Sequence, residues 1–199
     1  TLDPDDLLGA DRQHAGRARL QYGTADHGLQ GSLLAAGRDA GAEWLAGYLR
    51  RDAAESQNEW RLVDANPRDA RADAWLAKLV LAGLDEPLRL TVSGNRNHVR
   101  TDVRSLLLQP GRFANTTAMR GDDRSRSDSL ALDQALLDVG PLRELRWTLY
   151  LQRAAVDQHT FELRRDVPPR TPAVQLERDF RYRADVAGGC HAPALQPHA

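Results

Sequence analysis

The stretch QHAGRARLQYGTADHGLQGSLLAAG, residues 13–37, decides how the rest of the chain is interpreted. Small and apolar residues recur in and around this stretch every seven positions. Further small residues lie three or four positions after these, and together the two sets have the spacing of one stripe on an α-helix. The expected helix packing face consists of Leu8, Ala15, Ala18, Tyr22, Ala25 and Leu29. Each glycine costs a helix up to ~1 kcal/mol relative to alanine, so this helix needs a long partner that approaches it closely.

The sequence before residue 67 predicts a helical region, residues 1–66. Asp3 and Pro4 suit the start of the long helix. A second helix is expected from Ala42 to Leu62, and Asn66-Pro67 ends it. The chain begins at Thr1 instead of methionine. We therefore expect a basic leader and an apolar segment of ~20 residues to precede it in the natural protein.

Composition excludes several classes of protein. Of 199 residues, 41% are hydrophobic and 28% are charged, with a net charge of −1. That balance argues against a chain that is basic throughout and built for nucleic acid. The single cysteine, Cys190, excludes an intrachain disulfide. No apolar run approaches the ~20 residues of a membrane-spanning helix.

After residue 67 the hydrophobic period changes towards two, which predicts strands. We expect strands at 74–81, at 88–93 and 99–104 as a hairpin, at 145–152 with a return strand at 159–167, and at 176–185. A polar loop at 119–129, a short helix at 129–139 and a flexible tail at 190–199 complete the prediction. Residues 67–189 then form an antiparallel sheet, and the fold class is α+β, with the long helix packed on that sheet. Trp147, Leu149, Phe161 and Phe180 are expected to share one buried face against the 13–37 helix.

Two segments resemble minor pilins and pseudopilins, the subunits of type IV pili and type II secretion systems. Tyr22, Ala25, Gly28 and Leu29 match the family's Tyr-x-x-Ala-x-x-Gly-Leu pattern, and residues 88–119 resemble the hairpin of its head domain. The resemblance implies a non-enzymatic structural subunit whose N-terminal helix packs against other pilin subunits. It also implies a location in the cell envelope, in the periplasm or at the cell surface, and a membrane anchor formed by an apolar helix ahead of Thr1.

Two alternative functions stay open beside the pilin interpretation, together with an enzyme whose site is scattered. An arginine-rich sheet face could bind DNA for uptake (competence), with Tyr150 as a stacking platform. Its residues would be Arg146, Tyr150, Arg164, Arg181 and Arg183, although interleaved acids also fit an ordinary solvated face. Residues 66–88 resemble one tetratricopeptide unit, which would suit a helical-repeat adaptor for protein–protein interaction.

Motifs for catalysis, cofactors and metals do not stand out in the sequence. The catalytic, phosphate-binding and dinucleotide-binding motifs that we sought are absent, so no enzyme activity and no cofactor are expected. Cys190, His191 and His198 lie in a tail without a second ligand pair, so no metal site is expected. The tripeptide Arg120-Gly121-Asp122 spells an integrin-binding sequence in the expected loop, but such tripeptides arise often by chance.

Overall fold

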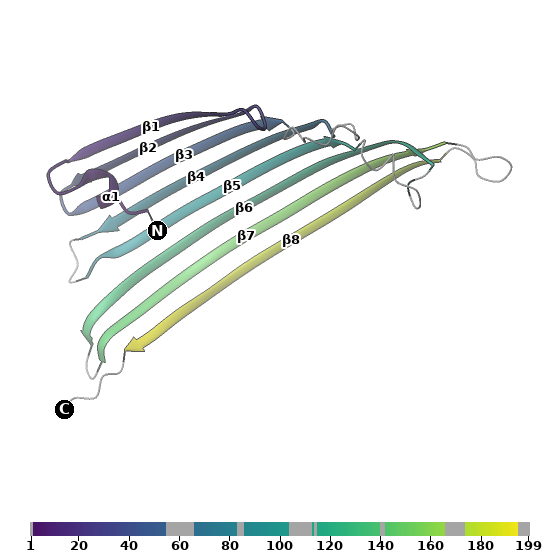
Figure 1. The fold of residues 1–199 in the computed structure, drawn as a ribbon. Helices are drawn as coiled ribbons and strands as arrows, with labels where there is room; N and C mark the ends of the chain where they lie inside the picture. The colour runs from purple at the N-terminus through teal and green to yellow at the C-terminus, as the bar shows by residue number, and fades with distance from the viewer. Residues whose placement is uncertain are drawn as a thin grey trace.

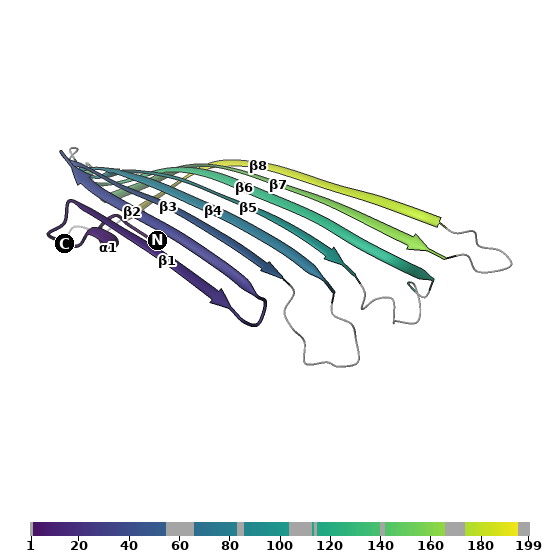
Figure 2. The same ribbon diagram turned by 90° about the horizontal axis from the view of Figure 1, so that it is seen from above.

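The computed structural model describes residues 2–54, 66–82, 86–103, 113, 115–139, 142–165 and 174–194. These residues form one eight-stranded antiparallel sheet, in which each strand pairs with the next along the chain, and a single turn of helix. Figures 1 and 2 show the sheet as one twisted layer with the helix at one end of it. The bounds are α1 Asp5–Leu8, β1 His14–Gly23, β2 Gly28–Asp39, β3 Ala42–Ala54, β4 Arg68–Leu81, β5 Leu88–Asp102, β6 Thr116–Val139, β7 Leu142–Arg164 and β8 Val174–Ala194.

The expected α+β fold with a long N-terminal helix is wrong. Residues 13–37 form a β-hairpin, and the only helix among the described residues is α1, with four residues. The hairpin turn lies at residues 24–27, where His27 has a φ of 48° and the Gly28 amide donates to Asp26 Oδ1 over 3.0 Å. A side chain that binds its own backbone two residues on is typical of such turns.

The second expected helix is also a strand, β3. Ala40 and Gly41 both have positive φ, 42° and 85°, and form a two-residue turn between β2 and β3. Turns of this kind match the right-handed twist of the strands that they join. Residues 55–65, the end of the expected helix, lie outside the described residues.

Several expected turns, and the expected helix at 129–139, lie inside uninterrupted strands. The hairpin expected at 88–104 is the single strand β5 as far as Asp102, and the one expected at 145–167 is the single strand β7 as far as Arg164. The loop at 119–129 and the helix at 129–139 are both parts of β6. The strands expected at 74–81 and 176–185 do lie within β4 and β8, but β8 continues to Ala194, through half of the expected tail. Strands of 21 to 24 residues are far longer than the usual five or six, so polar stretches within them look like loops.

The best-buried cluster lies where α1 packs on one face of the sheet. Leu8, Ala36 and Leu45 are buried there, with Leu7, Ala15 and Leu76 packed around them. The only lysine, Lys78, fixes the segment before α1: its Nζ donates to the Leu2 carbonyl over 2.8 Å and to Asp3 Oδ1 over 2.6 Å. We call this side of the sheet the covered face and the opposite side the open face.

The expectation that four aromatic and leucine residues share one buried face is wrong. Trp147, Leu149 and Phe161 alternate onto the open face, whereas Phe180 pairs with Gln158 and lies on the covered face. Leu149 is 54% exposed and Phe180 is 56% exposed. The alternation within each strand is right, but the described part of the chain contains no long helix to cover that face.

Truncation of Leu45 to alanine tests the core. Leu45 is 1% exposed against α1, so Leu45→Ala should lower the free energy of unfolding by about 2–5 kcal/mol. The matched change Leu20→Ala, at a side chain that is 75% exposed, should change it by less than ~1 kcal/mol. Denaturant unfolding measures both. Equal losses would show that α1 does not form the core contact.

Candidate functional site

The pairing register sorts the side chains of the open face into rows. In an antiparallel sheet, directly paired residues point to the same side. One row runs through Trp44, Leu79, Leu90, Leu132 and Leu149 across five consecutive strands. The neighbouring row runs through Gly16, Ala35, Ala46, Ala77, Val92, Leu130, Leu151 and Ala187. Neither row contains Asp, Glu, Lys or Arg from β1 to β8.

We call the larger apolar surface that these rows form the apolar belt. It consists of Leu20, Tyr22, Leu29, Leu33, Trp44, Tyr48, Trp75, Leu79, Leu81, Leu88, Leu90, Val92, Leu130, Leu132, Trp147, Leu149 and Leu151. Most of the exposed large apolar side chains on strands belong to it. A water-soluble monomer rarely exposes one contiguous apolar patch larger than a few hundred Å². We therefore expect the belt to be covered by a non-aqueous environment or by another molecule.

Tryptophan and tyrosine mark both borders of the belt. Tyr48 pairs with Trp75 at one border, and Trp147 lies near the other. The glycine opposite Trp75 makes room for its ring: a Cβ on Gly94 would lie 2.5 Å from Trp75 Nε1. Gly37 stands in the same relation to Trp44. These strand glycines therefore allow indole rings to lie across the neighbouring strand.

Beyond the Tyr48–Trp75 border the open face of β3 to β8 becomes charged, and we call this region the ionic zone. It spans three adjacent rows of paired residues. The first holds Arg50, Asp73, Arg96, Arg126 and Arg183; the second Asp52, Arg71, His98, Arg124, Asp157 and Arg181; the third Asp69, Arg100, Asp122, His159 and Asp179. On β1 and β2 the same rows hold the belt residues Leu20, Tyr22 and Leu29. On β6 to β8 the border row itself already holds Asp128, Arg153 and Asp185. Belt and ionic zone occupy the same face because alternate residues of the same strands supply both.

Asp122 joins the outer two rows. His98 Nε2 lies 3.0 Å from its Oδ1, and the Nε atoms of Arg100 and Arg124 donate to its carboxylate over 3.1 Å each. Burial opposes ionisation of Asp122, but these hydrogen bonds outweigh it and hold its pKa below the ordinary value. The arginines of these rows are thus largely neutralised by acids on the same or a neighbouring strand.

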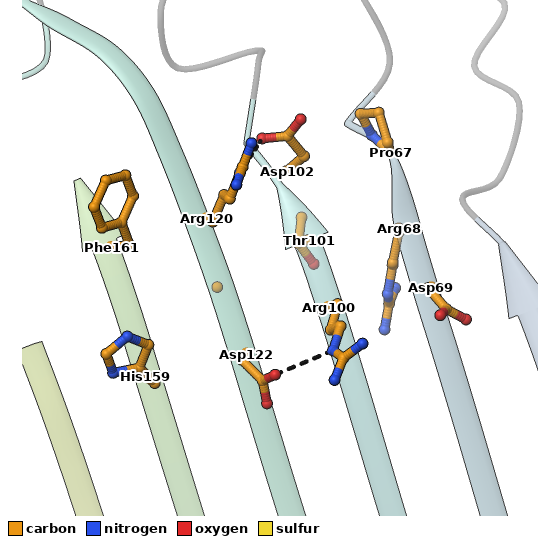
Figure 3. A pocket seen from close by; sticks show the side chains of 11 residues that line it. Pro67, Arg68, Asp69, Arg100, Thr101, Asp102, Arg120, Asp122, His159 and Phe161 are labelled. Atoms are coloured by element: carbon orange, nitrogen blue, oxygen red, sulfur yellow. Dashed lines mark hydrogen bonds and ion pairs between the residues drawn. The ribbon is translucent and has the colours of Figure 1, made fainter. Parts of the chain in front are cut away.

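A hollow of about 540 Å³ lies at the outer end of the ionic zone (Figure 3). Its lining includes the Arg100–Asp122 pair, His159 and Phe161, and Arg120 stands beside Asp102 at 3.7 Å. The Arg-Gly-Asp tripeptide of the sequence analysis is therefore part of strand β6, where its end residues contact other strands. Next to the hollow, His159 Nδ1 lies 2.7 Å from Asp179 Oδ1, which raises the pKa of His159.

The arginine strip expected for DNA does not form a common surface. Arg146, Tyr150 and Arg164 lie on the covered face, while Arg181 and Arg183 lie on the open face. Arg146 is paired with Glu144, and Arg164 Nε donates to the buried Glu162 over 2.8 Å. Arg181 lies 3.9 Å from Asp157.

The expected helix packing face is dispersed in the same way. Leu8 belongs to α1 and Ala15 to the covered face, whereas Ala18, Tyr22 and Leu29 lie on the open face and Ala25 lies in the turn. A spacing of seven residues puts successive members on opposite sides of a strand. The segment expected to resemble a tetratricopeptide unit lies largely in strand β4.

Among the described residues, no group of three or more His, Cys, Asp or Glu side chains is placed to hold a metal ion. Over the same part of the chain, no helix has the length and apolarity to cross a membrane. No protein-family model and no curated protein matches this sequence. One of the two segments that resemble pilins, Tyr22 to Leu29, lies in a β-hairpin instead of a helix.

The His159–Asp179 pair makes a prediction about pH. Because the folded pKa of His159 is raised, the charged pair contributes fully below the ordinary value of 6.5 and is lost as the pH rises through the folded pKa. Asp179→Asn should therefore bring the pKa of His159 down towards 6.5, as measured by NMR titration of the imidazole. Asp39→Asn, on the far strand β2, should leave that pKa unchanged. An unaltered His159 pKa in Asp179→Asn would contradict the pairing.

Proposed function

We propose that this chain is a non-enzymatic structural element of a lipid membrane, in which the apolar belt contacts acyl chains and the ionic zone lies outside the hydrocarbon. The observation that carries the proposal is the pair of charge-free rows that cross all eight strands on the open face. A charged side chain in the hydrocarbon core is costly, and these rows avoid that cost.

The dimensions of the belt support a lipid partner. Along β4 it runs from Trp75 to Leu81, about 20 Å at ~3.3 Å per residue. Membrane-spanning sheets carry an apolar band of ~25 Å with aromatic side chains at its borders. Three of the five aromatic residues of this belt stand at such borders: Tyr48 and Trp75 next to the ionic zone, and Trp147 near the opposite side. Trp44 lies in one of the charge-free rows, and Tyr22 lies on the edge strand β1.

Border aromatics also distinguish lipid from a second protein sheet. Two stacked sheets bury interdigitating side chains over their whole contact, which gives no reason to place Trp and Tyr at the two borders. In a bilayer these amphipathic rings prefer the level of the headgroups. Strand-to-strand pairing satisfies the backbone polar groups of β2 to β7 on both sides, while β1 and β8 are each paired on one side.

The covered face has the opposite character in the middle of the sheet. It presents small polar side chains there, among them Ser93 and Ser129, whose hydroxyls lie 2.6 Å apart. On this face Asn97 donates to Ser125 over 3.3 Å and Gln152 contacts Ser127 at 3.5 Å. In the middle of the sheet one face thus suits acyl chains and the other suits water or polar protein, although the covered face of β7 and β8 also exposes Tyr150, Phe180 and Tyr182.

The proposal retains the cell-envelope location expected from the sequence but attaches the chain to the membrane through its sheet. The pilin-type subunit, the DNA-uptake function and the repeat adaptor stay predictions, and no described residue set favours one of them. The membrane proposal also accounts for two glycines of the opening stretch, since Gly31 lies against Leu20 and Gly37 against Trp44, both belt side chains on neighbouring strands.

Charge placed in the belt tests the proposal. Leu149→Arg should cost about 2–4 kcal/mol of membrane stability and reduce binding of the chain to phosphatidylcholine vesicles in a flotation assay. Gln152→Arg adds the same charge to the same strand on the covered face and should bind like the unaltered chain. Tryptophan fluorescence should shift to the blue on binding. Equal flotation of both variants, or none by the unaltered chain, would contradict the proposal.

A further inference from the structure

The first row of the ionic zone differs from the other two in its charge. It holds four arginines and one aspartate, and Arg96 pairs directly with Arg126 across β5 and β6. Like charges that face each other across a sheet destabilise it. No hydrogen bond or ion pair to a described residue engages Arg96, Arg126 or Arg183, whereas Arg100 and Arg124 both bind Asp122. The first row therefore carries uncompensated positive charge.

A small residue opens a hollow between these arginines. Ala155 of β7 stands between Arg126 and Arg183 in the row, and it is only 6% exposed. The hollow measures about 650 Å³, and Arg96, Arg126 and Arg183 line it. His98 and the second-row arginines Arg71 and Arg124 complete its cationic side.

The two acids at the hollow are engaged elsewhere. Asp73 accepts a hydrogen bond from the Tyr48 hydroxyl, and Asp157 lies 3.9 Å from Arg181. Neither forms an ion pair with Arg96, Arg126 or Arg183 among the described residues. An anion in the hollow would relieve the repulsion between Arg96 and Arg126, and guanidinium groups bind phosphate oxygens through paired N–H donors.

We propose that this hollow over Ala155 binds a phosphate monoester through Arg96, Arg126 and Arg183. The row adjoins the Tyr48–Trp75 border of the apolar belt, so a lipid headgroup would present its phosphate at that level. This source of phosphate rests on the proposed membrane function. A soluble phosphate monoester offers the same chemistry without a membrane.

The experiment compares two probes on the full chain. The first is phosphatidylcholine vesicles with and without phosphatidic acid, measured by flotation; the second is glycerol 3-phosphate added to the chain in detergent, measured by its effect on the melting temperature. The unaltered chain should bind the vesicles with phosphatidic acid at least about tenfold more tightly. Glycerol 3-phosphate should raise its melting temperature.

Paired variants assign the effect to the hollow. Arg96→Gln/Arg126→Gln should abolish both responses while leaving binding to pure phosphatidylcholine intact. Its melting temperature without ligand should be no lower than that of the unaltered chain, because a repulsion has been removed. Arg17→Gln/Arg19→Gln removes the same charge from the covered face of β1 and should keep both responses.

Three outcomes would overturn the site. The first is that the unaltered chain shows neither a preference for phosphatidic acid nor a response to glycerol 3-phosphate, and the second is that the two double variants lose these responses equally. The third is preferential binding of duplex DNA that the Arg96→Gln/Arg126→Gln change removes. Failure of the membrane proposal gives a different result. In that case the chain binds neither kind of vesicle, and the glycerol 3-phosphate response alone decides whether the hollow binds phosphate.

Discussion

The cross-strand register is the constraint on which every other feature of this molecule depends. Each strand pairs with the next strand along the chain in a regular register over most of its length. Directly paired residues lie on the same face, so the register determines which residues of β1 to β8 share a face. A slip of one residue in any pair would move a whole strand's apolar set to the other side. The irregularity at Thr116/Ala118 lies at the end of β6, away from the belt.

From that register follow two surfaces with different chemistry on one face. The belt ends where the Tyr48–Trp75 pair gives way to the Arg50–Asp73 pair one step along the same two strands. Arginines in the outer rows pair with acids on the same or a neighbouring strand, as around Asp122, whereas Arg96, Arg126 and Arg183 of the row nearest the belt form no ion pair with a described residue. The helix α1 lies on the opposite face, so it leaves both surfaces free.

The sequence predicts which residues of a strand share one face better than it predicts where each strand begins and ends. Leu145, Trp147, Leu149 and Leu151 alternate as expected, because packing on one side of a strand imposes a period of two. Residues 13–37 were misleading because small residues occupy both faces there, which blurs that period, and a seven-residue repeat imitates a helix. The Ala40-Gly41 turn gave only a weak signal, because alanine is not among the residues that favour the positive φ it adopts there. The ionic zone could not be found from sequence, since its members come together only through the register of six strands.

The most direct test of the account is the accessibility of single spin labels along β7 in reconstituted bilayers, with Cys190 first replaced by serine. Labels at successive positions from 145 to 159 report contact with oxygen, which concentrates in lipid, and with a water-soluble relaxation agent. The account predicts a two-residue alternation, with oxygen contact highest at positions 145, 147, 149 and 151 and loss of that preference beyond Arg153. Uniform access by the water-soluble agent, or an alternation of opposite phase, would contradict it.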